Sequence, residues 1–100
     1  MKSGNEKPVL AIVDIFVDTM KLEEVTHDLC LIDAVQEVYE VTGEFDIATV
    51  VSSRSIEEFR DTLKNKIMKI PGVKSVVSSI VLSADKGPRA RPSSPENRER

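Results

Sequence analysis

Two side chains in this sequence are common starting points for catalysis, and both have simpler interpretations. His27 is the single histidine and stands beside Asp28 among polar residues, where a solvent-exposed imidazole is the more common role. Cys30 lies between Leu29 and Leu31 and has no identifiable base nearby, so we interpret it as a small buried hydrophobic residue. One histidine and one cysteine also fall short of a zinc-type ligand set. The sequence therefore predicts no catalytic residue, no metal site and no cofactor.

Carboxylates and glycines are present in numbers, but their positions favour structural roles. Two adjacent pairs, Glu23 with Glu24 and Glu57 with Glu58, open predicted helices, where acidic side chains offset the partial positive charge of the N-terminus. The four glycines are scattered along the chain and form no phosphate-binding loop. We therefore expect that the protein is not an enzyme.

Two features of the predicted sheet are more distinctive. The segment V-T-G-E-F-D at 41–46 places a glycine backbone, an aromatic ring and a carboxylate within one hairpin. The segment S-V-V-S-S at 75–79 adds hydroxyl groups to a strand otherwise built of valine. Ordinary turn chemistry and cross-strand pairing are alternative explanations for these residues.

The hydrophobic pattern divides the rest of the chain into secondary-structure elements. Residues 9–17 are almost entirely apolar and β-branched, which is typical of a central strand. Apolar residues at three- and four-residue steps over 22–32 predict a short amphipathic helix. Two further strands are expected over 34–42 and 45–51, joined by a tight turn at Gly43.

A second helix is the most clearly marked element. Ser55 and Glu58 form a capping box at its start. Its predicted apolar face consists of Ile56, Phe59, Leu63 and Ile67. The helix ends at Pro71 and Gly72, and residues 73–82 supply the last strand.

The order β-α-β-β-α-β predicts an α+β, ferredoxin-like fold, the architecture of the dimeric α/β-barrel superfamily. With right-handed crossovers it gives a four-stranded antiparallel sheet, two helices on one face, and the first and third strands in the middle. The other face then lacks a helix, although the first strand places Leu10, Ile12 and Phe16 on it. A second copy of the sheet is the simplest cover, so we expect a homodimer at least.

Composition bounds the domain organisation. The chain has 100 residues, of which 40% are hydrophobic, enough for one domain with one core. We expect a flexible N-terminus over 1–7, the domain over 8–83, and a disordered tail over 84–100, which is rich in proline, serine and arginine. Residues 1–83 contain nine lysines and arginines against fourteen acidic residues, which disfavours DNA binding through net charge.

The sequence also limits the expected location of the protein. No apolar run approaches the roughly 18 residues that cross a bilayer, and the first seven residues lack the hydrophobic stretch of a secretion signal. A lone cysteine excludes an internal disulfide and is compatible with a reducing compartment. We therefore expect a cytoplasmic protein that does not contact a membrane.

Several segments together resemble a known ligand-binding module. These are V-T-G-E-F-D at 41–46, S-I-E-E-F at 55–59, and I-P-G-V followed by S-S-I-V-L within 70–82. They are similar to the effector-binding domain of the leucine-responsive regulator and asparagine-synthesis activator family, also called the RAM domain. The resemblance covers roughly residues 8–83 and includes the order of the elements.

This resemblance implies a dimer whose sheets face each other, assembled further into tetramers or octamers. It also implies small effectors, usually amino acids, bound between dimers. Carried over by position, the effector-binding residues are Gly43, Glu44, Phe45, Asp46, Ser78, Ser79 and Ile80. Asp46 can pair with an ammonium group, whereas the N–H groups near Gly43 and the serine hydroxyls can bind a carboxylate.

The sequence departs from the family pattern in two places. Family members that regulate transcription carry a helix-turn-helix domain before this module, whereas only residues 1–7 precede the first strand here, so we expect no direct specific DNA binding. Val76 replaces a hydroxyl residue that is common in the last strand of the family.

Our first interpretation is a stand-alone module that senses an effector and assembles into oligomers, and that modulates transcription by co-assembly with a helix-turn-helix-containing relative. Two alternatives stay open at this point. One is a small dimeric enzyme of similar architecture, such as a monooxygenase or an isomerase. The other is a purely structural assembly domain.

Overall fold

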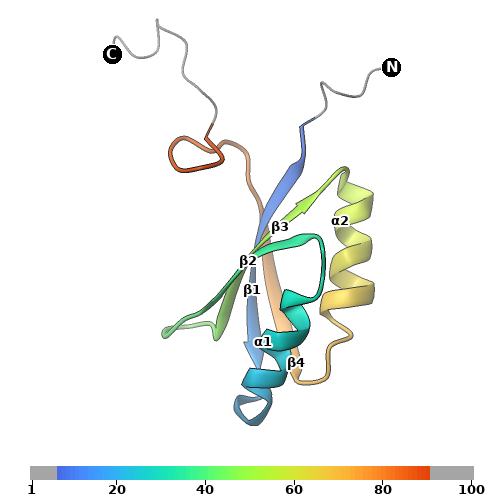
Figure 1. Ribbon diagram of the computed structural model, residues 1–100, viewed down its shortest axis with the longest axis vertical. Coiled ribbons are helices and arrows are strands. Elements are labelled where there is room, and N and C mark those ends of the chain that lie inside the picture. The colour runs from blue at the N-terminus through green and yellow to red at the C-terminus, as the bar shows by residue number, and fades with distance from the viewer. Residues whose placement is uncertain (1–6, 91–100) are drawn as a thin grey trace, which may run out of the picture.

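The computed structural model describes residues 7–90, which form two layers, a sheet and a pair of helices (Figure 1). The elements in chain order are β1 (Val9–Val17), η2 (Thr19–Lys21), α1 (Leu22–Cys30), β2 (Val35–Glu40), β3 (Ile47–Ser53), α2 (Ile56–Thr62), η3 (Leu63–Ile67) and β4 (Val73–Ile80). The strands pair antiparallel in the order β2-β3-β1-β4. The predicted ferredoxin-like fold, with the first and third strands in the middle, is confirmed.

The core lies between the helices and one face of the central strands. On β1, Ala11, Val13 and Ile15 are fully buried, because alternate residues of a strand point to the same side. They join a cluster that also contains Val17, Val25, Leu29, Ile47, Val51, Phe59, Ile67 and Ile70. The hydroxyl of buried Thr49 donates to the Val13 carbonyl at 2.9 Å, so this polar group is satisfied inside the core.

The start of α2 matches the predicted capping residue, whereas its later course differs from a regular helix. Ser55 Oγ accepts a hydrogen bond from the Glu58 backbone N–H at 3.0 Å. Further along, the Met68 N–H donates to the Leu63 carbonyl at 2.9 Å, which closes a π turn with one extra residue. Thr62, three residues after Phe59, is also buried although it was not among the residues predicted for the apolar face, and Ile56 in the first turn is 46% exposed.

Cys30 is exposed, so the prediction that it is buried was wrong. It is the last residue of α1, and Leu29 beside it points into the core. Neighbouring residues on a helix are about 100° apart around the axis, so the two side chains cannot share a face. The apolar residues on either side of Cys30 suggested burial, but Leu31 is itself 68% exposed.

Gly72 fixes the turn that leads into β4. Its φ is +103°, and a Cβ built there would lie 2.6 Å from Lys21 Cβ. Its carbonyl accepts a hydrogen bond from the Asp18 N–H at 2.8 Å, which holds the end of β1 to the start of β4. Both the positive φ and the close approach require glycine at this position.

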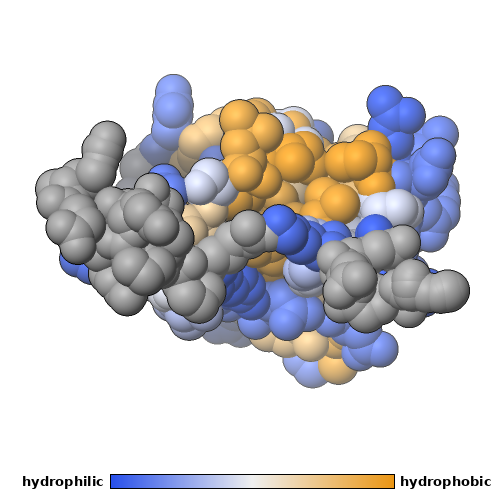
Figure 2. All heavy atoms as spheres, turned by 90° about the horizontal axis from the view of Figure 1, so that it is seen from above, coloured by the Kyte–Doolittle hydropathy of each residue, from blue (hydrophilic) through white to orange (hydrophobic). Residues whose placement is uncertain are grey.

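The free sheet face, the face of the sheet that carries no helix, presents apolar side chains. Ile12 on β1 is 43% exposed, Val77 on β4 is 48% exposed, and Tyr39 on β2 is 54% exposed. Asp14 stands among them on the central strand. Figure 2 shows hydrophobic residues gathered on one side of the molecule.

Residues 81–90, which we call the strap, continue from β4 toward β2. The Val81 N–H donates to the Leu10 carbonyl at 2.8 Å, and the Arg89 guanidinium forms an ion pair with Glu37. Residues 84–90, predicted from the sequence as part of a tail, therefore include a contact with the edge of the sheet. The predicted boundary after residue 83 stays a prediction, and residues 1–6 and 91–100 lie outside the described residues. Within residues 7–90, no helix is long and apolar enough to cross a membrane.

Candidate functional site

The β2–β3 hairpin is tied to the end of β1 through Asp46. The Asp46 N–H donates to the Ile15 carbonyl at 3.1 Å, and the Asp46 Oδ2 accepts a hydrogen bond from the Val17 N–H at 2.9 Å. The Asp46 carbonyl also accepts from the Val41 N–H at 3.0 Å, which closes the loop. The Asp46 carboxylate therefore has a structural role, whether or not a ligand is bound.

An aromatic pair lies beside this carboxylate. The rings of Phe16 and Phe45 have centroids 4.8 Å apart and planes at 51°. This tilted contact holds the loop over the end of β1 and is a favourable geometry for aromatic rings. Gly43 and Glu44, at the tip of the loop, are exposed, and the Gly43 φ of +143° is readily adopted only by glycine.

A pocket of about 290 Å³ opens at this end of the sheet. It is lined by Phe16, Val17, Asp46, Lys74 and Ser75. The lining thus combines a carboxylate, an ammonium group, a hydroxyl and an aromatic ring. Groups of opposite charge beside an apolar surface are suited to a small zwitterion.

The structure separates the two halves of the predicted site within one chain. Ser75 pairs with Phe16, next to the hairpin, whereas Ser79 pairs with Ile12. At about 3.3 Å per residue, Ser79 is displaced by about 13 Å along the strand from Ser75. Of the predicted residues, Phe45 and Asp46 lie at the pocket or against its lining, whereas Ser78, Ser79 and Ile80 lie exposed further along β4.

Four residues of this pocket, Phe16, Val17, Lys74 and Ser75, were not predicted from the sequence as site residues. Ser75 belonged to the hydroxyl-containing run that the sequence analysis noted, but the register of β4 against β1 decides which serine faces the hairpin. The register depends on the turn at Gly72, and no local sequence pattern gives it. Lys74 follows that turn, and apart from its charge nothing in the sequence around it indicated that it would line the pocket.

The other titratable groups of residues 7–90 include a helix-capping carboxylate but no cluster suited to a metal ion. No group of three or more His, Cys, Asp or Glu side chains in this range could hold a metal ion. His27 is exposed on α1. The Glu58 pKa is held below its usual range by a backbone hydrogen bond from Arg54, together with the Arg54 side chain, which is a helix-capping arrangement.

A family model of the Lrp/AsnC ligand binding domain matches residues 10–90. The chain belongs to the Lrp/AsnC ligand-binding domain family. An uncharacterised HTH-type transcriptional regulator of Pyrococcus furiosus is 33% identical over 90 residues, which cover 90% of this chain and 60% of that protein. The chain spans 50% to 60% of the length of several curated regulators that it matches.

Solved structures agree with this assignment to the Lrp/AsnC family. Escherichia coli AsnC is 29% identical with a TM-score of 0.73, over 84% of this chain and 55% of that one. A feast or famine regulatory protein from M. tuberculosis, complexed with L-methionine, is 25% identical with a TM-score of 0.70. That match covers 83% of this chain and 56% of the mycobacterial one.

Proposed function

We propose that this Lrp/AsnC domain senses an amino acid at the hairpin pocket and converts binding into a change of assembly. The observation that carries the proposal is the placement of Asp46 and Lys74 in one pocket of about 290 Å³, next to Phe16. The Asp46 carboxylate pairs with the ammonium group of the ligand. Lys74 and the Ser75 hydroxyl receive its carboxylate, and the aromatic surface accepts its side chain.

The distribution of apolar surface supports assembly with other copies. Ile12, Val77 and Tyr39 leave the free sheet face too apolar for a lone domain, and a second copy of the face covers it by self-association. Exposed Ser78, Ser79 and Ile80 on the edge strand β4 then complete the site from another copy. This explains why one chain alone does not bring the two halves of the predicted site together.

The proposed mechanism is linkage between ligand binding and oligomerisation. A ligand bound where two copies meet favours the assembly that supplies both halves of its site, typically by about 1–3 kcal/mol of coupling. Several of the relatives are named as HTH-type transcriptional regulators, which supports a role in transcription. This domain acts there as a sensing and assembly partner for a helix-turn-helix-containing relative and performs no enzymatic reaction.

A thermal-shift screen against the twenty amino acids tests the proposal. At 100 times its dissociation constant, a ligand adds about 2.7 kcal/mol to stability, which raises the melting temperature by several degrees. We expect at least one amino acid, L-methionine among the candidates, to produce such a shift. We expect Asp46→Asn and Lys74→Gln to reduce this shift in melting temperature. The control Lys86→Gln removes the same positive charge as Lys74→Gln, but on the strap, and we expect it to leave the shift intact.

Two results would contradict this function. One is the absence of a shift with every amino acid at millimolar concentration. The other is an equal shift in Asp46→Asn, Lys74→Gln and the unmodified chain, which would place the ligand elsewhere.

A further inference from the structure

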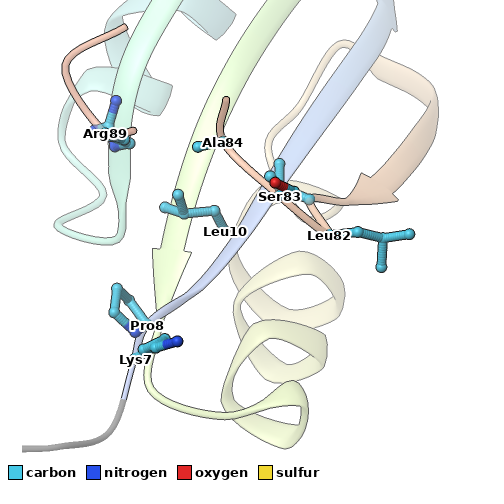
Figure 3. Close-up of a pocket in the computed structure, with 8 residues that line it drawn as sticks. Lys7, Pro8, Leu10, Leu82, Ser83, Ala84 and Arg89 are labelled. Carbon is cyan, nitrogen blue, oxygen red and sulfur yellow. The ribbon is translucent and has the colours of Figure 1, made fainter. Parts of the chain in front are cut away.

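The strap crosses the free sheet face from one edge of the sheet to the other. It leaves the edge strand β4 at Val81, whose N–H donates to the Leu10 carbonyl at 2.8 Å. It reaches the opposite edge strand, β2, where Arg89 forms an ion pair with Glu37. Figure 3 shows part of this path, from Leu82, which points away from the other labelled side chains, to Arg89. Because β1 and β3 lie between the two edges, the strap passes over the central strands.

The residues beneath the strap belong to the surface that a second copy covers in the proposed assembly. Ile12 of β1, Val50 of β3 and Tyr39 of β2 line the space between the strap and the sheet. Glu37 stands two positions from Tyr39 and therefore on the same side of β2. Val77 of β4 does not line that space and is 48% exposed. The strap therefore occupies one end of the free sheet face and leaves the other end open.

The free sheet face is too small for both occupants at once. Strands lie about 4.8 Å apart and rise about 3.3 Å per residue, so four strands of 6 to 9 residues cover roughly 500 Å² in projection. A standard protein interface buries about 800 Å² of accessible surface on each partner. A second copy therefore needs the whole face, including the end under the strap.

The strap is held loosely on the sheet. A space of about 350 Å³ remains between the two, so their surfaces are not close-packed. The ion pair of Arg89 with Glu37 is partly exposed, at 32% and 30% of the two side chains, and exposed pairs contribute little stability. A second sheet that packs closely on the face can therefore displace the strap.

Internal turns give the strap a shape of its own. Ser83 Oγ donates to Asp85 Oδ1 at 2.7 Å, and the Ala90 N–H donates to the Gly87 carbonyl at 3.0 Å. Gly87 has a φ of +107°, and nothing outside the neighbouring residues lies within 4 Å of a Cβ built there. A residue with a side chain at position 87 therefore strains the docked turn without touching the sheet.

From these observations we propose that the strap is an intramolecular competitor of self-association. Docked on its own sheet, it excludes a second copy from the free sheet face, and it leaves the face when two sheets pack together. A chain that is competent to bind for only part of the time has an affinity reduced by that fraction. The strap thus sets the concentration at which the domain dimerises. This inference rests on the proposed cover of the free sheet face by a second copy and concerns the regulation of that contact.

A strap linked covalently to its own sheet tests this competition. Cys30 is the single cysteine, so the triple variant Cys30→Ser, Glu37→Cys, Arg89→Cys carries one cysteine on each side of the strap contact. A short bismaleimide joins the two cysteines, and in the matched control each cysteine is capped with N-ethylmaleimide instead. By sedimentation equilibrium, we expect the linked chain to associate more weakly than the capped chain by about ten-fold or more, because its face stays covered. We expect the capped chain to associate at least as tightly as the unmodified chain.

Gly87→Ala provides an independent test that changes neither the charge nor the sheet face. Strain in the docked turn favours release of the strap, and we expect association to tighten by about two- to five-fold. In the linked variant the same substitution has no effect, because the strap cannot leave the sheet. Circular dichroism confirms that each variant is folded.

Three outcomes would overturn the competition alone. These are equal association of the linked and capped chains, weaker association of Gly87→Ala than of the unmodified chain, and cross-links formed exclusively between two chains, which would place the strap on a second copy. An unmodified chain that stays monomeric at micromolar concentration would overturn the proposed assembly and this inference together. Failure of the strap mechanism is therefore distinguishable from failure of the proposed function.

Discussion

The Asp46 Oδ2 accepts a hydrogen bond from the Val17 N–H at 2.9 Å, so a side chain of the hairpin closes the end of the central strand. The same carboxylate lines the pocket with Lys74 and Ser75. The proposed ligand contact and the observed structural contact therefore involve the same residue. Because a carboxylate has two oxygens, Asp46 can hold the backbone and bind an ammonium group at once.

Substitutions of Asp46 separate these two roles. Asp46→Ala removes the acceptor for a partly buried N–H, and we expect a loss of about 1–3 kcal/mol in the free energy of unfolding. Asp46→Asn keeps an acceptor oxygen at the same place, so we expect a much smaller loss in the free energy of unfolding. The same substitution removes the charge, and we expect it to weaken amino-acid binding by roughly 1–3 kcal/mol. Chemical denaturation and calorimetric titration measure the two effects. Equal stabilities of the Ala and Asn variants would show that the bond to Val17 contributes little.

The glycines at the two turns provide a matched pair of substitutions. In Gly72→Ala, the new Cβ meets Lys21 Cβ at 2.6 Å in addition to an unfavourable φ of +103°. In Gly43→Ala, the φ is +143° but no atom lies within 4 Å of the new Cβ. Backbone strain costs about 1–3 kcal/mol in each, and overpacking adds about 1–3 kcal/mol to Gly72→Ala alone. We expect a clearly lower melting temperature for Gly72→Ala than for Gly43→Ala, and the reverse order would contradict this account of the turn into β4.

The strap contact depends on pH through Glu37. Hydrogen bonds from Arg89 first, and from Tyr39 second, hold the Glu37 pKa below its usual range. A carboxyl pKa lower in the folded than in the unfolded state contributes stability above the unfolded value, about 4.3 for glutamate, and this is lost as pH falls through the folded value. Carbon NMR of the Glu37 carboxyl between pH 2 and 7 measures this shift. We expect Arg89→Gln to move the Glu37 pKa upward, and no movement would mean that the strap is not docked on β2.

Asp14 limits how tightly a second copy can cover the free sheet face. By register it stands between Ala48 of β3 and Val77 of β4, on a largely apolar surface. Burying an unpaired carboxylate costs several kcal/mol, so we expect Asp14→Asn to tighten the dimer about ten-fold or more, equivalent to about 1.4 kcal/mol. Ile12→Asp adds a second charge to the face and weakens the dimer. Sedimentation equilibrium measures both, and weaker association of Asp14→Asn would place a cationic partner opposite Asp14.

Local patterns in the sequence predict most of the fold. The apolar run at 9–17 predicts the central strand, Ser55 predicts the start of α2, and Pro71 with Gly72 predicts the turn before β4. These features depend on neighbouring residues, because caps, turns and strand burial are determined within a few positions of the chain. The π turn at 63–67 has no such local signature.

The candidate site is less predictable, because it depends on contacts between distant segments. Asp46 was identified from its hairpin, but its bond to Val17 spans 29 positions. Ser75 and Ser79 have the same chemistry in the sequence, and only the register against β1 places Ser75 at the hairpin. The pairing of Glu37 with Arg89 spans 52 positions and joins segments that composition assigned to different parts of the chain.

Sedimentation equilibrium of the unmodified chain, with and without the amino acid that raises its melting temperature most, tests the central claim most directly. At micromolar concentration without ligand, we expect a dimer or a larger assembly, because the free sheet face is apolar. With ligand, we expect the distribution to shift toward the assembly that completes the hairpin pocket, and Asp46→Asn to abolish the shift. A monodisperse monomer of 11.1 kDa under both conditions would contradict the claim that this domain senses its ligand through assembly.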